Sequence, residues 1–311
     1  MEFGIEIPEA KPFDGVALGL NAVDHLIVVP HYPEFNSKIP YQSHTLAPGG
    51  QSATAMVTLA RLGLSASYIG KVGSDEEGRF QISSLASEGV DTAGIIVVEG
   101  AESQNAFIII DQATGERTIL WRRDERLTIR EEEVDERAVT AGRVLHIDGH
   151  DVAASIASAR FARRAGIPVV LDIDNVYAGA ENLLPLVDFL ISSSSFPERV
   201  TGERDIAEAL KRLHEDYGSL MVAATLGSDG ALGYIHDQYV HSPAFKVECR
   251  DTTGAGDAFH GGFIYGLLKG FSVEETLKFA NAVAALKCRA VGARTALPRI
   301  DEVNSLLASG F

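Results

Sequence analysis

The stretch DTTGAGDAFHGGF at residues 251–263 decides the fold prediction, because a glycine-rich turn opens a helical segment here. Phe259, Phe263 and Leu267 recur at every fourth position after the turn, as on one face of an α-helix. Residues 244–250 alternate between apolar and polar side chains, a pattern typical of a strand. The stretch is therefore predicted to form a strand, a glycine turn and a helix.

The glycine turn has the composition of an anion site. Gly254 and Gly256 permit a close ligand approach that a side chain would block. The free N–H groups of a first helical turn and the helix dipole favour negative charge, such as a phosphoryl group. Asp257 could accept a hydroxyl proton while the turn holds the charge on the transferred group. The alternative is that Asp257 only caps the helix and the glycines only form a turn.

Outward from this turn, short apolar runs alternate with segments of helical spacing. We predict strands at 16–19, 67–70, 143–147, 168–173, 189–192 and 220–225, and helices at 52–62, 78–87, 132–141, 153–165 and 206–215. Continuous Val, Ile and Leu runs are typical of parallel strands covered on both faces. The expected fold class is α/β, with a mostly parallel central sheet between two helical layers.

Two segments break the alternation, because residues 25–46 and 103–122 contain strand formers without a helix. The second segment has a hairpin signal at 111–115. If the two segments pair, they form a small β-sheet lid over the strand ends where ligands bind. We therefore expect a single domain over 1–311 with a discontinuous lid.

Composition limits the partners and the compartment. The net charge of −16 leaves no basic excess for nucleic acid or an anionic membrane surface. Only Cys249 and Cys288 are present, which favours a reducing compartment. We find no signal peptide or spanning apolar run and expect a cytoplasmic protein. A dinucleotide-binding Gly-x-Gly-x-x-Gly after the first strand and a Walker motif are both missing, which argues against a dehydrogenase and a P-loop ATPase.

Two signatures resemble a known family. Residues 251–257 resemble the C-terminal signature of the PfkB, or ribokinase, carbohydrate kinase family, and residues 47–63 resemble its N-terminal signature. Further similar stretches lie at 21–24, 70–75, 225–230 and 292–294, so the resemblance covers essentially the whole chain. It implies a ribokinase-like fold and ATP-dependent phosphorylation of a hydroxyl of a sugar or sugar derivative.

The resemblance also implies roles for individual residues. Asp257 matches the catalytic base, and Gly254, Ala255 and Gly256 match the anion hole. The candidate substrate-binding residues are Asn21, Asp24, Lys38, Gly49, Gly50 and Thr54. The candidate nucleotide-binding residues are Thr225, Gly227, Ser228, Gly230 and Asn281. Mg²⁺ is expected with ATP, and Asp251 and Thr253 resemble a monovalent-cation site, which points to K⁺ as a further cation.

The sequence departs from the family at two places. Ser193 and Phe196 lie where the family has an Asn-x-x-Glu motif, so we hypothesise that Asp172 or Asp174 takes part in holding magnesium. Thr54 replaces an asparagine of the family, which alters hydroxyl recognition. Residues 49–55 and 243–247 are also similar to the bacterial sulfofructose kinase branch, in which case Lys38 could meet an anionic substituent.

Several alternatives stay open. A nucleoside kinase would use the same residues with a stacking aromatic from the lid, for which the candidates are Tyr32, Phe35, Tyr41 and Phe107. A sugar- or nucleotide-binding protein without catalysis is the second alternative. Trp121, Arg122 and Asp148 are further candidates for substrate contact, whereas the mixed charges of 123–126 predict a solvated face. Exposed lid strands could pair two subunits into a homodimer.

Overall fold

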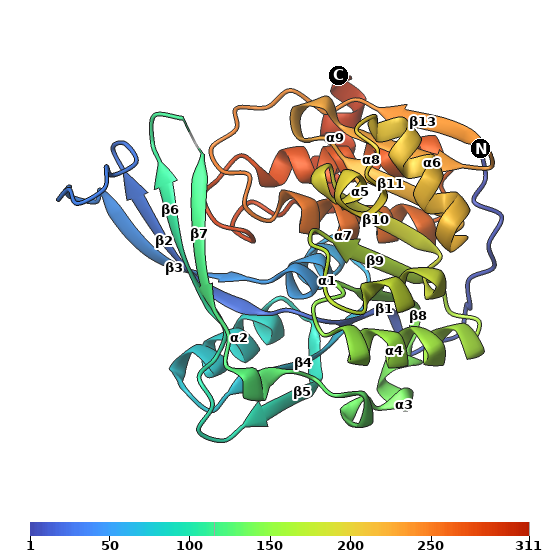
Figure 1. Ribbon diagram of the computed structural model, residues 1–311, viewed down its shortest axis with the longest axis horizontal. Helices are drawn as coiled ribbons and strands as arrows, with labels where there is room; N and C mark the ends of the chain where they lie inside the picture. Colours follow the sequence, from blue (N-terminus) through green and yellow to red (C-terminus); the bar gives the residue numbers. More distant parts are fainter. Residues whose placement is uncertain (115, 311) are drawn as a thin grey trace.

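The computed structural model describes residues 1–114 and 116–310, which form two sheets and their covering helices (Figure 1). Within these described ranges, the larger sheet has nine strands in the order β13-β12-β11-β10-β9-β8-β1-β4-β5, in which the β11–β12 and β12–β13 pairings are antiparallel and the other pairings are parallel. Its strands are β1 (Phe13–Leu18), β4 (Ala66–Gly73), β5 (Asp91–Val98), β8 (Gly142–Ile147), β9 (Val169–Ile173), β10 (Phe189–Ser193), β11 (Met221–Thr225), β12 (Ala231–Ile235) and β13 (Gln238–Ser242). The predicted α/β class is confirmed.

Helices cover both faces of the large sheet. They are α1 (Gln51–Arg61), α2 (Glu76–Ser87), α3 (Glu136–Val139), α4 (Val152–Arg164), α5 (Ser195–Thr201), α6 (Ile206–Tyr217), α7 (Ala255–Leu268), α8 (Val273–Lys287) and α9 (Ile300–Ser309). Short 3₁₀ turns lie at η1 (Glu125–Leu127), η2 (Glu131–Glu133), η3 (Ala180–Asn182), η4 (Leu184–Leu186) and η5 (Gly227–Asp229). Because successive side chains of a strand point to opposite faces, β9 contributes Val170 to one core and Leu171 to the other.

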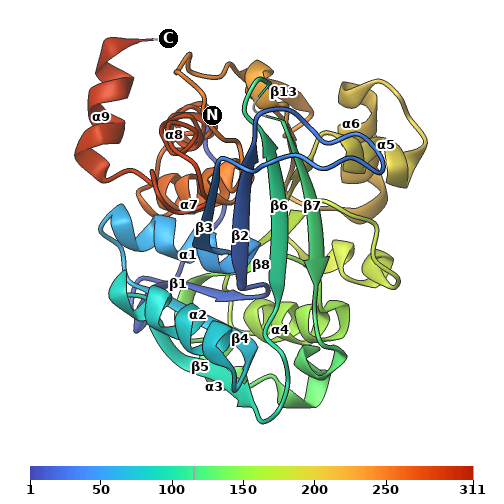
Figure 2. The same cartoon turned by 90° about the vertical axis from the view of Figure 1, so that its left-hand side faces the viewer.

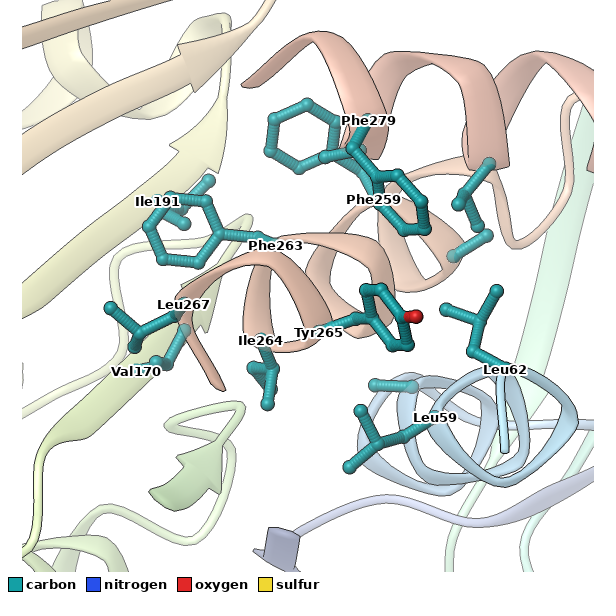
Figure 3. Packing of buried hydrophobic residues seen from close by; sticks show 14 of the residues in the cluster. Leu59, Leu62, Val170, Ile191, Phe259, Phe263, Ile264, Tyr265, Leu267 and Phe279 are labelled. Carbon is teal, nitrogen blue, oxygen red and sulfur yellow. The ribbon is translucent and has the colours of Figure 1, made fainter. Parts of the chain in front are cut away.

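Helix α7 packs into one of the two hydrophobic cores beside the large sheet. Phe259 and Phe263 of α7 pack among side chains of α1, α8 and the large sheet (Figure 3). Gly262 allows a close approach between α7 and α8, because a Cβ there would lie 2.9 Å from the Cα of Ala280. The beginning of α7 is thereby held on a rigid platform.

The smaller sheet has four strands in the order β3-β2-β6-β7. They are β2 (Ala22–Val29), β3 (Ser43–Gly49), β6 (Asn105–Asp111) and β7 (Arg117–Arg122), so the two segments singled out in the sequence lie side by side (Figure 2). Leu26, Ala106 and Ile108 form a small core on one face of this sheet. The predicted turn at 111–115 includes Gly115, which lies outside the described residues.

Three local predictions were wrong. Residues 244–250 form no strand, because Pro243 has no N–H to continue the ladder and the N–H of Arg250 donates to Cys288. The helix predicted at 132–141 is reduced to η2 and α3. Arg123 does not lie on a solvated face, since its guanidinium forms a buried ion pair with Asp151 at 2.6 Å. Within the described ranges, no helix combines the length and the apolar character needed to span a bilayer.

Candidate active site

A cavity of about 890 Å³ opens where the large sheet, α7 and the smaller sheet meet. Asp172, Ser192 and Thr225 line it from the C-terminal ends of three parallel strands, β9, β10 and β11. Asp24 and Trp121 line it from the smaller sheet. The carboxyl ends of parallel strands are where ligands bind in such sheets, so this cavity is the candidate active site.

Asp257 lies in the first turn of α7, half-buried at the cavity wall. Burial raises the pKa of this carboxyl to about 8, and the nearby Asp172 raises it further, whereas His260 and Arg294 oppose the shift. A carboxyl group with this pKa changes protonation state close to neutral pH. Such a group can accept a proton from a substrate hydroxyl.

The glycine turn before Asp257 has a defined shape. Gly254 is the N-cap of α7 with φ 77°, and a Cβ there would lie 2.9 Å from the Cα of Ala293. Gly254 and Gly256 line the cavity. Ala255 does not, and its N–H donates to the Thr252 carbonyl oxygen at 3.1 Å. Of the three predicted anion-hole residues, only the two glycines therefore border the cavity.

Asp24 and Gly50 also line the cavity. Asp24 is 5% exposed, and burial raises the pKa of its carboxyl to about 6 although the Arg294 charge opposes the shift. Gly50 is the N-cap of α1 with φ 92°. Gly49 precedes it without lining the cavity, and a Cβ at Gly49 would overlap the Asp24 carboxylate. Glycine at 49 thus leaves the space that Asp24 occupies.

Arg294 is a residue of this site to which the sequence analysis assigned no role. Its guanidinium is buried and donates to Asn21 Oδ1 at 3.0 Å, to Thr54 Oγ1 at 3.1 Å and to the carbonyl oxygen of Gly49. Asn21 and Thr54 do not line the cavity. These two side chains bind Arg294, which holds the wall that carries Asp24. The signal was present in the sequence, as part of the Gly-Ala-Arg stretch at 292–294.

The remaining candidates divide between the cavity and its surroundings. Thr225 lines the cavity, and the turn with Gly227, Ser228 and Gly230 follows it outside the cavity lining. Asn281 is buried on α8, and its Nδ2 donates to the carbonyl oxygen of Ser242 at 2.8 Å. Lys38 lies in the exposed loop between β2 and β3 and does not line the cavity.

Two carboxylates lie beside Asp257. Asp172 and Asp174 line the cavity, and Asp172 Oδ2 lies 3.5 Å from His260 Nδ1. Burial raises the pKa of Asp172 well above its usual range, and the Asp174 charge adds to this shift. Phe196 is fully buried, so its position offers no ligand for a metal. Among the residues of the two described ranges, no cluster of three or more His, Cys, Asp or Glu could hold a metal ion alone.

The aromatic side chains of the cavity differ from those predicted to stack on a nucleobase, but they include Trp121, a predicted candidate for substrate contact. Trp121, His150 and Tyr177 line it, with ring centroids 6.1 Å apart for Trp121–His150 and 5.3 Å apart for His150–Tyr177. The lid aromatics proposed for stacking, Tyr32, Phe35, Tyr41 and Phe107, are exposed and do not line it.

Two further candidates for substrate contact also lie away from the cavity. Asp148 is buried, and it accepts hydrogen bonds from the Leu20 N–H and from Ser52 Oγ. Arg122 forms an exposed ion pair with Glu102. Neither residue lines the cavity.

The sheet order, the small sheet over the strand ends and the cavity between them define a ribokinase-like α/β protein. The sequence pattern described as "pfkB family carbohydrate kinase" matches residues 17–300. An ATP-dependent ribose-1-phosphate kinase of Halopiger xanaduensis is 33% identical over 93% of this chain and 96% of its own length. A ribokinase of Haemophilus influenzae is 28% identical over 93% of this chain and 97% of its own length.

A solved structure shows the same fold. The crystal structure of an Agrobacterium tumefaciens protein superposes with a TM-score of 0.90 at 28% identity, covering 96% of this chain and 98% of that one. The chain therefore belongs to the pfkB family of carbohydrate kinases, and its class of activity is phosphoryl transfer to a sugar.

Proposed function

We propose that the protein transfers the γ-phosphoryl group of ATP to a hydroxyl of a sugar or sugar phosphate, with Asp257 as the general base. The observation that carries this proposal is that Asp257 lines one cavity together with Asp24 and Gly50, which are candidate substrate residues, and with Thr225, a candidate nucleotide residue. A sugar hydroxyl held by the first pair and a nucleotide held near Thr225 would meet at this carboxylate.

The reaction follows from this arrangement. Asp257 accepts the hydroxyl proton as the substrate oxygen attacks the γ-phosphorus, and ADP leaves with the electrons of the broken P–O bond. The backbone turn from Gly254 to Gly256 and the helix dipole of α7 stabilise the charge on the transferred group. With a pKa of about 8, the Asp257 carboxylate binds the proton more firmly than an ordinary aspartate does, and the fraction of ionised base increases as the pH rises through about 8.

The residues around Asp257 fit magnesium bound together with ATP. Magnesium usually keeps several waters and takes one or two protein carboxylates plus substrate phosphates, and the cavity offers two carboxylates of this kind. We assign Asp172 and Asp174 to this role, since both line the cavity. When bound, magnesium neutralises charge on the triphosphate.

The charged side chains at the cavity bear on which sugars it could bind. Asp24 and the backbone at Gly50 suit sugar hydroxyls. Arg117 and Arg199 also line the cavity, and guanidinium groups pair well with phosphate. A sugar phosphate therefore stands beside a neutral sugar as a candidate, which agrees with the name of the Halopiger relative. The likeness to sulfofructose kinase stays a prediction.

A nucleoside kinase is the second candidate, and the aromatic wall formed by Trp121, His150 and Tyr177 favours it. A nucleobase stacks well on such side chains.

We also propose a homodimer through the outer face of the smaller sheet. Leu46, His25, Phe107 and Leu120 lie in one register row across its four strands. The three apolar side chains of this row are 44 to 56% exposed. A second copy that covers this row would remove apolar surface from water.

The test is ADP formation with magnesium and a panel of ribose, ribose 1-phosphate, ketoses, sugar acids, sulfosugars and nucleosides. We expect one class to be turned over and Asp257→Asn to lower kcat by about 10²- to 10⁴-fold with the substrate still bound. Asp216→Asn on the exposed face of α6 is the matched control. Undiminished turnover in Asp257→Asn would remove the base assignment, and ligand-induced thermal stabilisation without any turnover would favour a binding protein.

A further inference from the structure

The last residue of α8 is a lysine with no exposed side-chain surface. Lys287 is fully buried, and its Nζ donates a hydrogen bond to the backbone carbonyl oxygen of Asp251 at 2.8 Å. The same nitrogen lies 3.9 Å from Asp251 Oδ2. Lysine is almost never fully buried unless it is paired, because the ammonium group loses its hydration. Asp251 supplies both a dipole and a charge that compensate for this loss.

Asp251 is the centre of a small polar cluster. Its Oδ1 accepts hydrogen bonds from the N–H of Thr253 at 2.9 Å and from Thr253 Oγ1 at 2.7 Å. Its Oδ2 accepts from the N–H of Gly292 at 2.8 Å. The cluster therefore joins three parts of the chain, namely the end of α8, the loop at 292 and the start of the glycine turn.

We infer that the ammonium group of Lys287 is a built-in replacement for a monovalent cation at Asp251, and that the protein works without potassium. The sequence resemblance implied a cation site at Asp251 and Thr253. The residues present do not fit such an ion, because the ammonium group of Lys287 already donates to the Asp251 carbonyl oxygen at 2.8 Å and lies 3.9 Å from the Asp251 carboxylate. Two cations at the same oxygens would repel each other.

The cluster bears directly on the catalytic turn. Asp251 and Thr253 immediately precede Gly254, which packs against Ala293 one residue beyond Gly292. A cation between Asp251 and α8 holds this turn in place without touching a reacting atom. Lys287 is thus a positioning residue for Gly254–Asp257, and this part of the inference rests on the proposed function. Burial lowers the pKa of Lys287, and the Asp251 charge opposes that shift.

The test compares cations in two readouts, the thermal midpoint Tm and substrate turnover, in KCl, NaCl, NH₄Cl and choline chloride at equal ionic strength. For the wild type we expect the same Tm and the same turnover in all four salts. A wild-type Tm or turnover that rises specifically with KCl would overturn the inference. Because Tm needs no substrate, this arm decides the inference even if the proposed kinase activity is not found.

Two variants extend the test. Lys287→Ala leaves a space with free oxygen ligands, so we expect a lowered Tm and a kcat lower by about 10²-fold, both recovering in KCl or NH₄Cl but not in choline chloride. Lys287→Met fills the space with an apolar chain. Its Tm and kcat should fall in the same way and should not recover in KCl or NH₄Cl. Lys246→Ala, an exposed lysine before the turn, is the control and should behave as wild type. A folded Lys287→Ala that responds to neither cation contradicts the inference; if this variant does not fold, the wild-type salt comparison still decides it.

Discussion

Arg294 Nη2 donates a hydrogen bond of 3.0 Å to Asn21 Oδ1, although 273 positions separate the two residues in the chain. Asn21 follows β1, and Arg294 follows α8. The same guanidinium binds Thr54 and the carbonyl oxygen of Gly49. One buried cation thus fixes the segment between β1 and β2, the end of β3 and α1, which together carry the Asp24 wall of the cavity.

Arg294→Lys should therefore weaken both folding and substrate binding. A lysine keeps the charge but cannot reach several acceptors in one plane, so Asn21 and Thr54 would lose their buried partner. We expect the free energy of unfolding to fall by about 1 to 3 kcal/mol and KM for the sugar to rise by about tenfold. Denaturant titration and steady-state kinetics measure the two effects. Arg289→Lys, on an exposed arginine, is the control, and an equal effect there would contradict the prediction.

The two glycines at the start of α7, Gly254 and Gly256, should respond differently to substitution by alanine. Gly254 has φ 77° and its Cβ would press on Ala293, so Gly254→Ala should lower the free energy of unfolding by about 1 to 3 kcal/mol. A Cβ at Gly256 would meet nothing within 4 Å, so Gly256→Ala should keep full stability. Because Gly256 borders the cavity, we expect both variants to lose turnover. Thermal melts of the two variants measure the difference. If Gly254→Ala and Gly256→Ala lost the same stability, the left-handed conformation at Gly254 would not be the reason for glycine there.

The pH dependence of stability should reveal Asp257. Its pKa of about 8 exceeds that of an unfolded aspartate, so the folded state holds the proton more tightly. This contribution to stability is complete below about pH 4 and is lost as the pH rises through about 8. Asp257→Asn cannot ionise, so its stability relative to the wild type should grow by about 3 to 4 kcal/mol from pH 5 to pH 8. Parallel profiles of stability against pH for the wild type and Asp257→Asn would contradict this prediction. The control Asp216→Asn should give a profile parallel to that of the wild type.

Magnesium handling should depend on the two carboxylates beside Asp257. In the double variant Asp172→Asn and Asp174→Asn, the magnesium concentration for half-maximal turnover should rise by about tenfold or more. Magnesium titration at fixed ATP measures this shift. Glu198→Gln, an exposed carboxylate of α5, is the control and should leave the titration unchanged. The assignment is wrong if the double variant titrates like the wild type.

Much of the fold was predictable because local patterns agree with it. The apolar runs at 168–173 and 189–192 become β9 and β10, since strands buried on both faces need apolar side chains at every position. The glycine turn before α7 was predictable for a similar reason, because only glycine takes its left-handed backbone without strain. The strand predicted at 244–250 does not form, because alternation of apolar and polar side chains does not by itself supply a partner strand.

The candidate site was only partly predictable. Residue type and motif identified Asp257, Asp24 and Thr225, which all line one cavity. Sequence alone could not separate them from Asn21 and Thr54, whose side chains bind Arg294. Whether a polar side chain contacts a ligand or another residue depends on its neighbours in space, and these come from distant parts of the chain.

By itself, the sequence determined the layers of the fold, the glycine turn before α7 and the family. The tertiary structure decided which polar groups are already paired, as with Lys287 beside Asp251 and Arg294 beside Asn21. The physical reason is that secondary structure follows local backbone preference and hydrophobic periodicity. The state of a buried charge follows from the groups that packing brings within a few ångströms of it.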